Sequence, residues 1–103
     1  IGEQIMIFEI LQTLGLPCAY GKFDKDPEPP YLIYMGAGQL QFEADTTYYK
    51  KRNQYHIEYY FKQKNEELED QIEDLLLANG YRYDKSEDIY FDDEKIFGIY
   101  YEI

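Results

Sequence analysis

The chain has 103 residues, of which 45% are hydrophobic; this suits one folded domain and leaves no room for two. Its 21 acidic and 10 basic residues give a formal net charge of −11, which disfavours direct binding to nucleic acid or to anionic lipid. The single cysteine excludes an intramolecular disulfide and favours a reducing, intracellular compartment, and no apolar run approaches the length of about 20 residues that a membrane helix needs.

The N-terminal segment, residues 1–14, predicts a helix that is apolar on more than one side. Apolar residues recur at helical spacing, at Ile1, Ile5, Phe8 and Leu11. Three more apolar residues lie off this stripe: Met6, Ile7 and Ile10. Gly15 and Pro17 end the segment. A helix that is apolar on more than one side is either deeply buried or in contact with a second subunit. We expect Met6, Ile7 and Ile10 to be covered by a second subunit. The chain begins at Ile1 rather than at methionine, so we also expect native residues before it.

The middle of the chain predicts several strands separated by loops. We expect strands at 18–20, 31–35 and 39–44. The glycines of 36–38 are expected to form the turn that closes the 31–35 strand. Residues 21–30 are rich in proline and turn-forming residues and predict a loop. The clearest strand follows, because four large apolar residues alternate with polar ones: Tyr55, Ile57, Tyr59 and Phe61.

Residues 45–53 predict a polar loop that contains the one concentrated basic run of this acidic chain: Lys50, Lys51 and Arg52. Neighbouring tyrosines could pair with these cations to bind single-stranded nucleic acid, but the net charge of −11 opposes that interpretation. We therefore expect the run to contact an acidic protein surface, including one on another copy of this chain.

Residues 65–80 predict an amphipathic helix with Asn65 as its N-cap and Asn79 and Gly80 at its end. The expected inner face is apolar, formed by Leu68, Ile72, Leu75 and Leu76. The expected outer face is acidic, formed by Glu66, Glu69, Asp70, Glu73 and Asp74.

The C-terminal part predicts a strand at 81–83, a polar turn at 84–88, and a hairpin of 89–91 with 96–103 across the acidic turn 92–95. Two helices among antiparallel-looking strands predict an α+β fold. We expect a single domain spanning residues 1–103, with a mostly antiparallel sheet and both helices packed on one face.

No combination of residues predicts catalysis or a bound metal. His56 is the only histidine, Ser86 is the only serine, and neither has a partner nearby in the sequence that would make a catalytic pair with it or with Cys18. A calcium loop counted from Asp24 fails, because proline stands at its sixth position and Met35 at its twelfth. The acids of 92–94 could hold a divalent ion adventitiously, but a hairpin tip of this kind is ordinarily solvated. We expect no enzymatic activity, no catalytic residue, no cofactor and no metal ligand.

The 13 tyrosines exceed what a small core needs. Tyrosine combines a large contact area with a polar tip and is favoured at protein interfaces, which we consider the better interpretation. The alternative is that tyrosine replaces valine and tryptophan, both absent here, in half-buried strands.

The order of several segments resembles one family of proteins. These segments are Leu16–Phe23, Pro29–Tyr34, Phe42–Asp45, Tyr55–Tyr60 ahead of an acidic helix, and Phe97–Glu102. They are similar to segments of the tail-completion or tail-terminator proteins of long-tailed bacteriophages and prophages, also known as minor tail or head–tail joining proteins. The resemblance implies an α+β subunit without cofactor or enzymatic activity.

If the resemblance holds, copies of this chain form a ring that caps the tail tube and meets the head connector. The resemblance also implies assembly in the host cytoplasm and a final location in the virion tail. A negative ring opening would keep DNA that leaves the head from sticking. A second hypothesis is an acidic, phage-encoded inhibitor that mimics DNA and occupies a basic site on a host protein. The third hypothesis is a small enzyme, which would need a pocket in which catalytic side chains converge.

Overall fold

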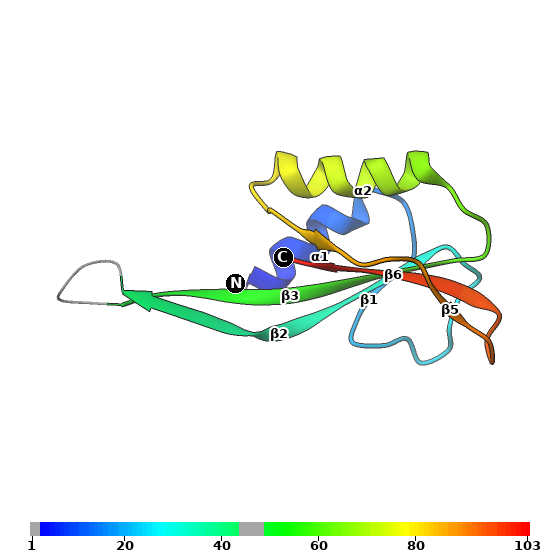
Figure 1. Cartoon of the computed structure of the whole chain (residues 1–103), viewed down its shortest axis with the longest axis horizontal. Coiled ribbons are helices and arrows are strands. Elements are labelled where there is room, and N and C mark those ends of the chain that lie inside the picture. The colour runs from blue at the N-terminus through cyan, green and yellow to red at the C-terminus, as the bar shows by residue number, and fades with distance from the viewer. Residues whose placement is uncertain (1–2, 44–48) are drawn as a thin grey trace.

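The computed structural model describes residues 3–43 and 49–103 and has the α+β architecture expected from the sequence. The strands are β1 (Cys18–Tyr20), β2 (Tyr31–Glu43), β3 (Tyr49–Phe61), β4 (Asp84–Lys85), β5 (Ile89–Phe91) and β6 (Ile96–Glu102). They form one sheet in the order β1-β2-β3-β6-β4, and β5 also pairs with β6. Only the β1–β2 pair is parallel among the described strands. The helices α1 (Glu3–Gln12) and α2 (Glu66–Ala78) lie on the same face of the sheet (Figure 1).

The core lies between β3 and the two helices, and the predicted alternation of β3 is confirmed. Its inward residues are buried: Tyr55, Ile57, Tyr59 and Phe61. They belong to one cluster with residues of α1, α2 and β6, namely Ile7, Leu11, Ile72, Leu76, Ile99 and Tyr101. The same cluster includes Leu32 and Tyr34 of β2, so the core extends under both helices across the middle strands of the sheet, with β3 between β2 and β6.

Helix α2 begins and ends as its sequence predicts. The Asn65 side chain caps it by accepting a hydrogen bond from the Leu68 N–H at 3.1 Å, and Gly80 adopts a positive φ of 85° just beyond its end. Ile72 and Leu76 are buried, while Leu68 and Leu75 are half-buried, so the predicted inner face is confirmed.

The predicted acidic face of α2 is wrong at two positions. Glu69 is only 2% exposed and Glu73 is half-buried, because both carboxylates turn toward lysines that lie outside the helix. The exposed acidic residues of α2 are Glu66, Glu67, Asp70 and Asp74.

Helix α1 is rotated about its axis relative to the prediction. Ile7 and Leu11 face the core and are at most 1% exposed, whereas Ile5, which we placed inside, is 42% exposed. The interpretation of Ile7 as a surface residue is therefore wrong, because the pair at positions i and i+4 that faces the sheet is Ile7 with Leu11. Gly15, with a φ of 76°, ends this segment as expected. Ile1 lies outside the described residues.

Strands β2 and β3 are longer than predicted. The expected turn at 36–38 is a β-bulge instead, where Gly38 takes a φ of 100° and the pairing shifts between Gly36 and Gln39. Pairing then continues to Glu43, opposite Tyr49, so the part of the expected 45–53 loop from residue 49 onward is strand. Residues 44–48 and the side chain of Lys50 lie outside the described part of the chain.

The strand expected at 81–83 is not formed, and a two-residue strand, β4, lies inside the predicted turn instead. Tyrosine side chains anchor the segment before β4: the Tyr81 hydroxyl donates to Glu3 at 3.0 Å and the Tyr83 hydroxyl to Glu73 at 3.2 Å. These tertiary contacts outweigh the strand propensity of the tyrosines. The β5–β6 hairpin is confirmed.

Aromatic residues also cover the sheet face opposite the helices. Tyr60 lies 5.9 Å from Phe91 and 5.2 Å from Tyr31 between ring centroids. Gly98 makes this packing possible, since a Cβ there would lie 2.9 Å from the Phe91 ring and 3.0 Å from Tyr60. Among the described tyrosines, five are buried, and Tyr20 and Tyr90 are among the exposed large apolar residues. The structure favours the alternative interpretation, in which tyrosine replaces valine and tryptophan in half-buried strands.

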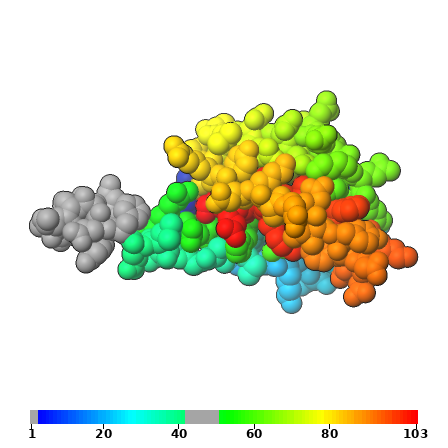
Figure 2. Space-filling model, in the orientation of Figure 1, coloured from blue at the N-terminus to red at the C-terminus, as the bar shows by residue number. Residues whose placement is uncertain are grey.

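The molecule is elongated because β2 and β3 extend past the rest of the sheet. Its principal extents are 51 × 27 × 26 Å, and its radius of gyration of 15.0 Å exceeds the value of about 13 Å expected for a compact chain of this length. Figure 1 shows the two strands projecting from the body, and in the space-filling view of Figure 2 their described residues, in green, lie at one end of it. We call the projecting part, Gln39–Glu43 with Tyr49–Asn53, the arm.

We predict that Ile72→Ala lowers the free energy of unfolding by about 2–5 kcal/mol, because the residue is fully buried between α2 and the sheet. Leu75→Ala should cost less, since this side chain is half-buried. Leu77→Ala is the matched control on the same helix; Leu77 is 54% exposed, so its loss should stay below about 0.5 kcal/mol. Urea unfolding measures all three. A loss below roughly 1 kcal/mol for Ile72→Ala would contradict the observed orientation of α2.

Candidate functional site

Cys18 and His56 do not form a catalytic pair. Cys18 packs against the core, and burial raises the pKa of its thiol to about 11, so it is protonated and a weak nucleophile near neutral pH. His56 lies between the core-facing Tyr55 and Ile57 and projects from the opposite face of the sheet. Its Nδ1 atom lies 3.7 Å from a carboxylate oxygen of Glu102. The two side chains therefore face away from each other across the sheet.

Ser86 has a structural role in the chain between β4 and β5. Its hydroxyl accepts a hydrogen bond from the Tyr100 N–H and donates one to the carbonyl of Glu87, both at 2.8 Å. Within residues 3–43 and 49–103, no group of three or more His, Cys, Asp or Glu side chains could hold a metal ion. None of the helices described there is long and apolar enough to cross a membrane.

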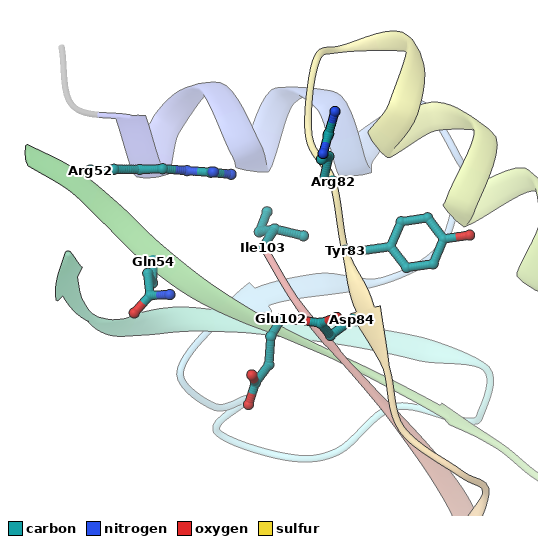
Figure 3. Close-up of a pocket in the computed structure, with 7 residues that line it drawn as sticks. All are labelled: Arg52, Gln54, Arg82, Tyr83, Asp84, Glu102 and Ile103. Carbon is teal, nitrogen blue, oxygen red and sulfur yellow. The ribbon is translucent and has the colours of Figure 1, made fainter. Parts of the chain in front are cut away.

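A groove of about 330 Å³ lies where β6 ends beside β3 (Figure 3). It is lined by Arg52, Gln54, Arg82, Tyr83, Asp84, Glu102 and Ile103. In the view of Figure 3, Arg52 and Arg82 lie on one side and the carboxylates of Asp84 and Glu102 on the other. The groove thus offers balanced charges to a polar segment of a protein, but it contains no nucleophile with a base.

Glu69 carries a buried carboxylate held between two lysines. Its side chain is 3% exposed, and its two oxygens lie 2.7 Å from Lys64 Nζ and 2.9 Å from Lys85 Nζ. A buried charge is tolerated only when it is paired in this way. The two ion pairs connect α2 to β4 and to the loop that precedes the helix.

Glu73 extends the same network to β6. Its carboxylate lies 2.7 Å from Lys85 Nζ and accepts hydrogen bonds from Tyr101 at 2.7 Å and Tyr83 at 3.2 Å. Burial alone raises the pKa of this carboxyl, but the contacts with Lys85 and Tyr101 outweigh burial and hold the pKa below its usual range. The contacts of Glu73 are all with residues of the chain, so they fasten α2 to the sheet. The buried Oε2 atom of Glu69 accepts no hydrogen bond from the described residues and is balanced by the charge of Lys64 Nζ at 2.7 Å.

The arm has two unpaired backbone edges. On the β2 side, β1 pairs only with Leu32–Tyr34, and on the β3 side, β6 begins its pairing at His56. Among the described residues, no third strand pairs with Gln39–Glu43 or Tyr49–Asn53. The arm's described side chains are all exposed: Gln39, Leu40, Gln41, Lys51, Arg52 and Asn53. Free strand edges of this kind are sites at which another chain can add.

A second exposed feature is the groove between α1 and α2. It has a volume of about 340 Å³ and is lined by Met6, Glu9, Ile10, Thr13, Leu75 and Asn79. Met6 is 54% exposed and Ile10 is half-buried, so two of the three apolar residues expected at an interface do reach this surface. Within one copy, Met6 and Ile10 lie on the helices whereas Lys51 and Arg52 lie on the arm, so these four residues do not form a single site.

Comparison of the sequence with models of known protein families finds no match. Comparison with curated proteins finds no significant relative either.

We predict that Glu73→Gln lowers the free energy of unfolding by about 1–2 kcal/mol at pH 7, because charged hydrogen bonds with Lys85 and Tyr101 are weakened. Because the pKa of Glu73 is lowered in the folded protein, its contribution is present above the unfolded pKa of about 4.3 and is lost as pH falls through the folded value. The difference from wild type should therefore shrink below about pH 4.

Urea unfolding at a series of pH values measures this difference. Glu67→Gln, an exposed carboxylate on the same helix, is the control and should change stability by less than about 0.5 kcal/mol at pH 7. An equal difference for Glu73→Gln at pH 7 and at pH 3 would show that the Glu73 charge does not stabilise the fold.

Proposed function

We propose that this protein is a structural subunit of a bacteriophage or prophage tail that acts by contact with other proteins rather than by catalysis. In this proposal it assembles with copies of itself into a ring at the head–tail joint, and the ring contacts the tail tube and the head connector. The role is that of the tail-completion and tail-terminator proteins, which the order of the sequence segments resembles.

The observation that carries the proposal is the arm. One core and a buried ion network hold the body together. Two long strands extend from it, and no third strand among the described residues pairs with the outer edges of the arm, whose described side chains are exposed. Natural proteins avoid leaving strand edges free, because such edges promote association with other chains. An arm of this kind is understandable in a subunit whose edges are covered after assembly.

The charge of the molecule suits the same role. A net charge of −11 spread over a small domain repels DNA, which a ring around a DNA passage must not bind. Cys18, His56 and Ser86 are each placed in a way that disfavours nucleophilic catalysis, which agrees with a structural role.

The exposed acids of α2 support the alternative, an inhibitor that mimics DNA. Glu66, Glu67, Asp70 and Asp74 present a row of negative charge that a basic protein surface could bind. This alternative does not need the arm, and it predicts a monomer or dimer that binds a DNA-binding protein in a salt-sensitive manner.

The two functions are separated by light scattering over a concentration series, with and without the tail-tube protein. We expect the mass to rise above that of a dimer at high concentration or on the tail tube. A strict monomer under every condition, without affinity for tail-tube or connector proteins, would remove the ring and favour the inhibitor.

A further inference from the structure

The helix layer of the protein carries charge of only one sign. Neither α1 nor α2 contains a lysine or arginine, while both contain acidic residues. Lys64 and Lys85 neutralise Glu69 and Glu73 from outside the helices, but they leave the other acids of α2 exposed. A partner that docks on this layer should therefore be basic.

The groove between the helices adds an apolar floor to this acidic layer. Met6, Ile10 and Leu75 supply apolar surface, and Met6 alone is 54% exposed. Glu9 lines the groove, and the exposed Asp74 is the neighbour of Leu75 on α2. The surface thus combines a small apolar depression with carboxylates at its border, and it fits a segment with an apolar side chain next to cations.

The arm is a segment with that composition. Leu40 is 49% exposed and pairs in register with Arg52, while the neighbouring Gln41 pairs with Lys51. Lys51 and Arg52 are both exposed and belong to the one concentrated basic run of the sequence. The arm projects away from the helix layer of its own copy, as Figure 1 shows, so it is available to a different copy.

We propose that the groove between α1 and α2 of one copy receives the arm of a second copy. Leu40 and Arg52 are paired in register and share one face of the arm, so Leu40 enters against Met6 and Ile10 while Arg52 faces the carboxylates of Glu9 and Asp74. Lys51 lies on the other face of the arm and adds positive charge beside the contact. This inference rests on the self-association in the proposed function and names the two surfaces that meet.

The arrangement explains how copies add in one direction. Arm and groove are different surfaces, so each contact is head-to-tail and leaves one arm and one groove free. Such contacts continue until the rotation between copies closes a ring. A symmetric dimer made from the same two surfaces would use both pairs at once and stop growing.

Charge reversal on the arm tests the ionic half of the contact. The double variant Lys51→Glu and Arg52→Glu should raise the concentration at which copies associate by about tenfold or more, measured by sedimentation velocity at low salt. Glutamate keeps a charge on the strand edge and still opposes unspecific edge pairing, so only the sign changes. The matched control is Lys22→Glu with Lys25→Glu, which makes the same change of net charge on the exposed 21–30 loop and should have little effect.

Compensation on the groove makes the test specific. Glu9→Lys with Asp74→Lys should weaken association by itself, and the four substitutions combined in one chain should restore it, because every contact is then reversed on both sides. The arm variant could weaken association while the combined chain fails to restore it. In that case the arm docks on another surface, and the inference is overturned.

The apolar half is tested with Met6→Asp against Ile5→Asp. Both residues are exposed on α1, at 54% and 42%, but only Met6 lines the groove, so only Met6→Asp should weaken association. Circular dichroism verifies that each variant is folded. Wild-type association that survives all groove and arm variants would overturn this inference and leave the ring intact. A wild type that never associates, even on the tail tube, would overturn both.

Discussion

Strands β2 and β3 have 13 residues each, whereas β6 has 7 and β1 has 3. The helices cover only the part of the sheet where β2 and β3 lie beside the shorter strands (Figure 1). The remaining length of β2 and β3 has no neighbouring strand among the described residues and forms the arm. The molecule therefore has two parts: a covered body that contains the core, and an uncovered hairpin that carries exposed polar and basic residues. The proposed function depends on the second part and the stability on the first.

The body is fixed by interactions of two kinds. Apolar residues of both helices form one cluster with residues of β2, β3 and β6, and the lysines that pair with Glu69 and Glu73 attach α2 from outside the helix. Buried ion pairs add little net stability but disfavour other placements of the helix, since a shifted helix would leave a buried charge without a partner. The fixed helix gives the groove next to α1 a defined shape, which a docking partner requires.

The sequence predicts what depends on local pattern. The alternation around Ile57, the Asn65 cap and the stripe through Ile72 each depend on neighbours in the chain, and all three are confirmed. The bulge at Gly36–Gly38 could not be told from a turn, because glycine suits both and only cross-strand pairing decides between them. The inward turn of Glu69 was missed for a related reason: its partner Lys85 lies on a strand 16 residues away.

The candidate surfaces were also only partly predictable, because they depend on contacts between residues far apart in the sequence. The surplus of apolar residues on the first helix signalled an uncovered face, but its rotation depends on the sheet, which takes Ile7 and leaves Ile5 and Met6 outside. The basic run is evident from the sequence alone. That it lies on a strand, opposite residues such as Leu40, follows from the pairing of β2 with β3.

The arm is exposed in the single chain, and in the proposed assembly it is covered by a second copy. Amide hydrogen exchange of residues 39–41 and 51–53 measures this directly, with the exchange of β6 as an internal reference. We expect fast exchange of the outward amides of the arm at low concentration and clear protection under conditions where copies associate. Equal exchange of the arm in dissociated and associated protein would contradict it.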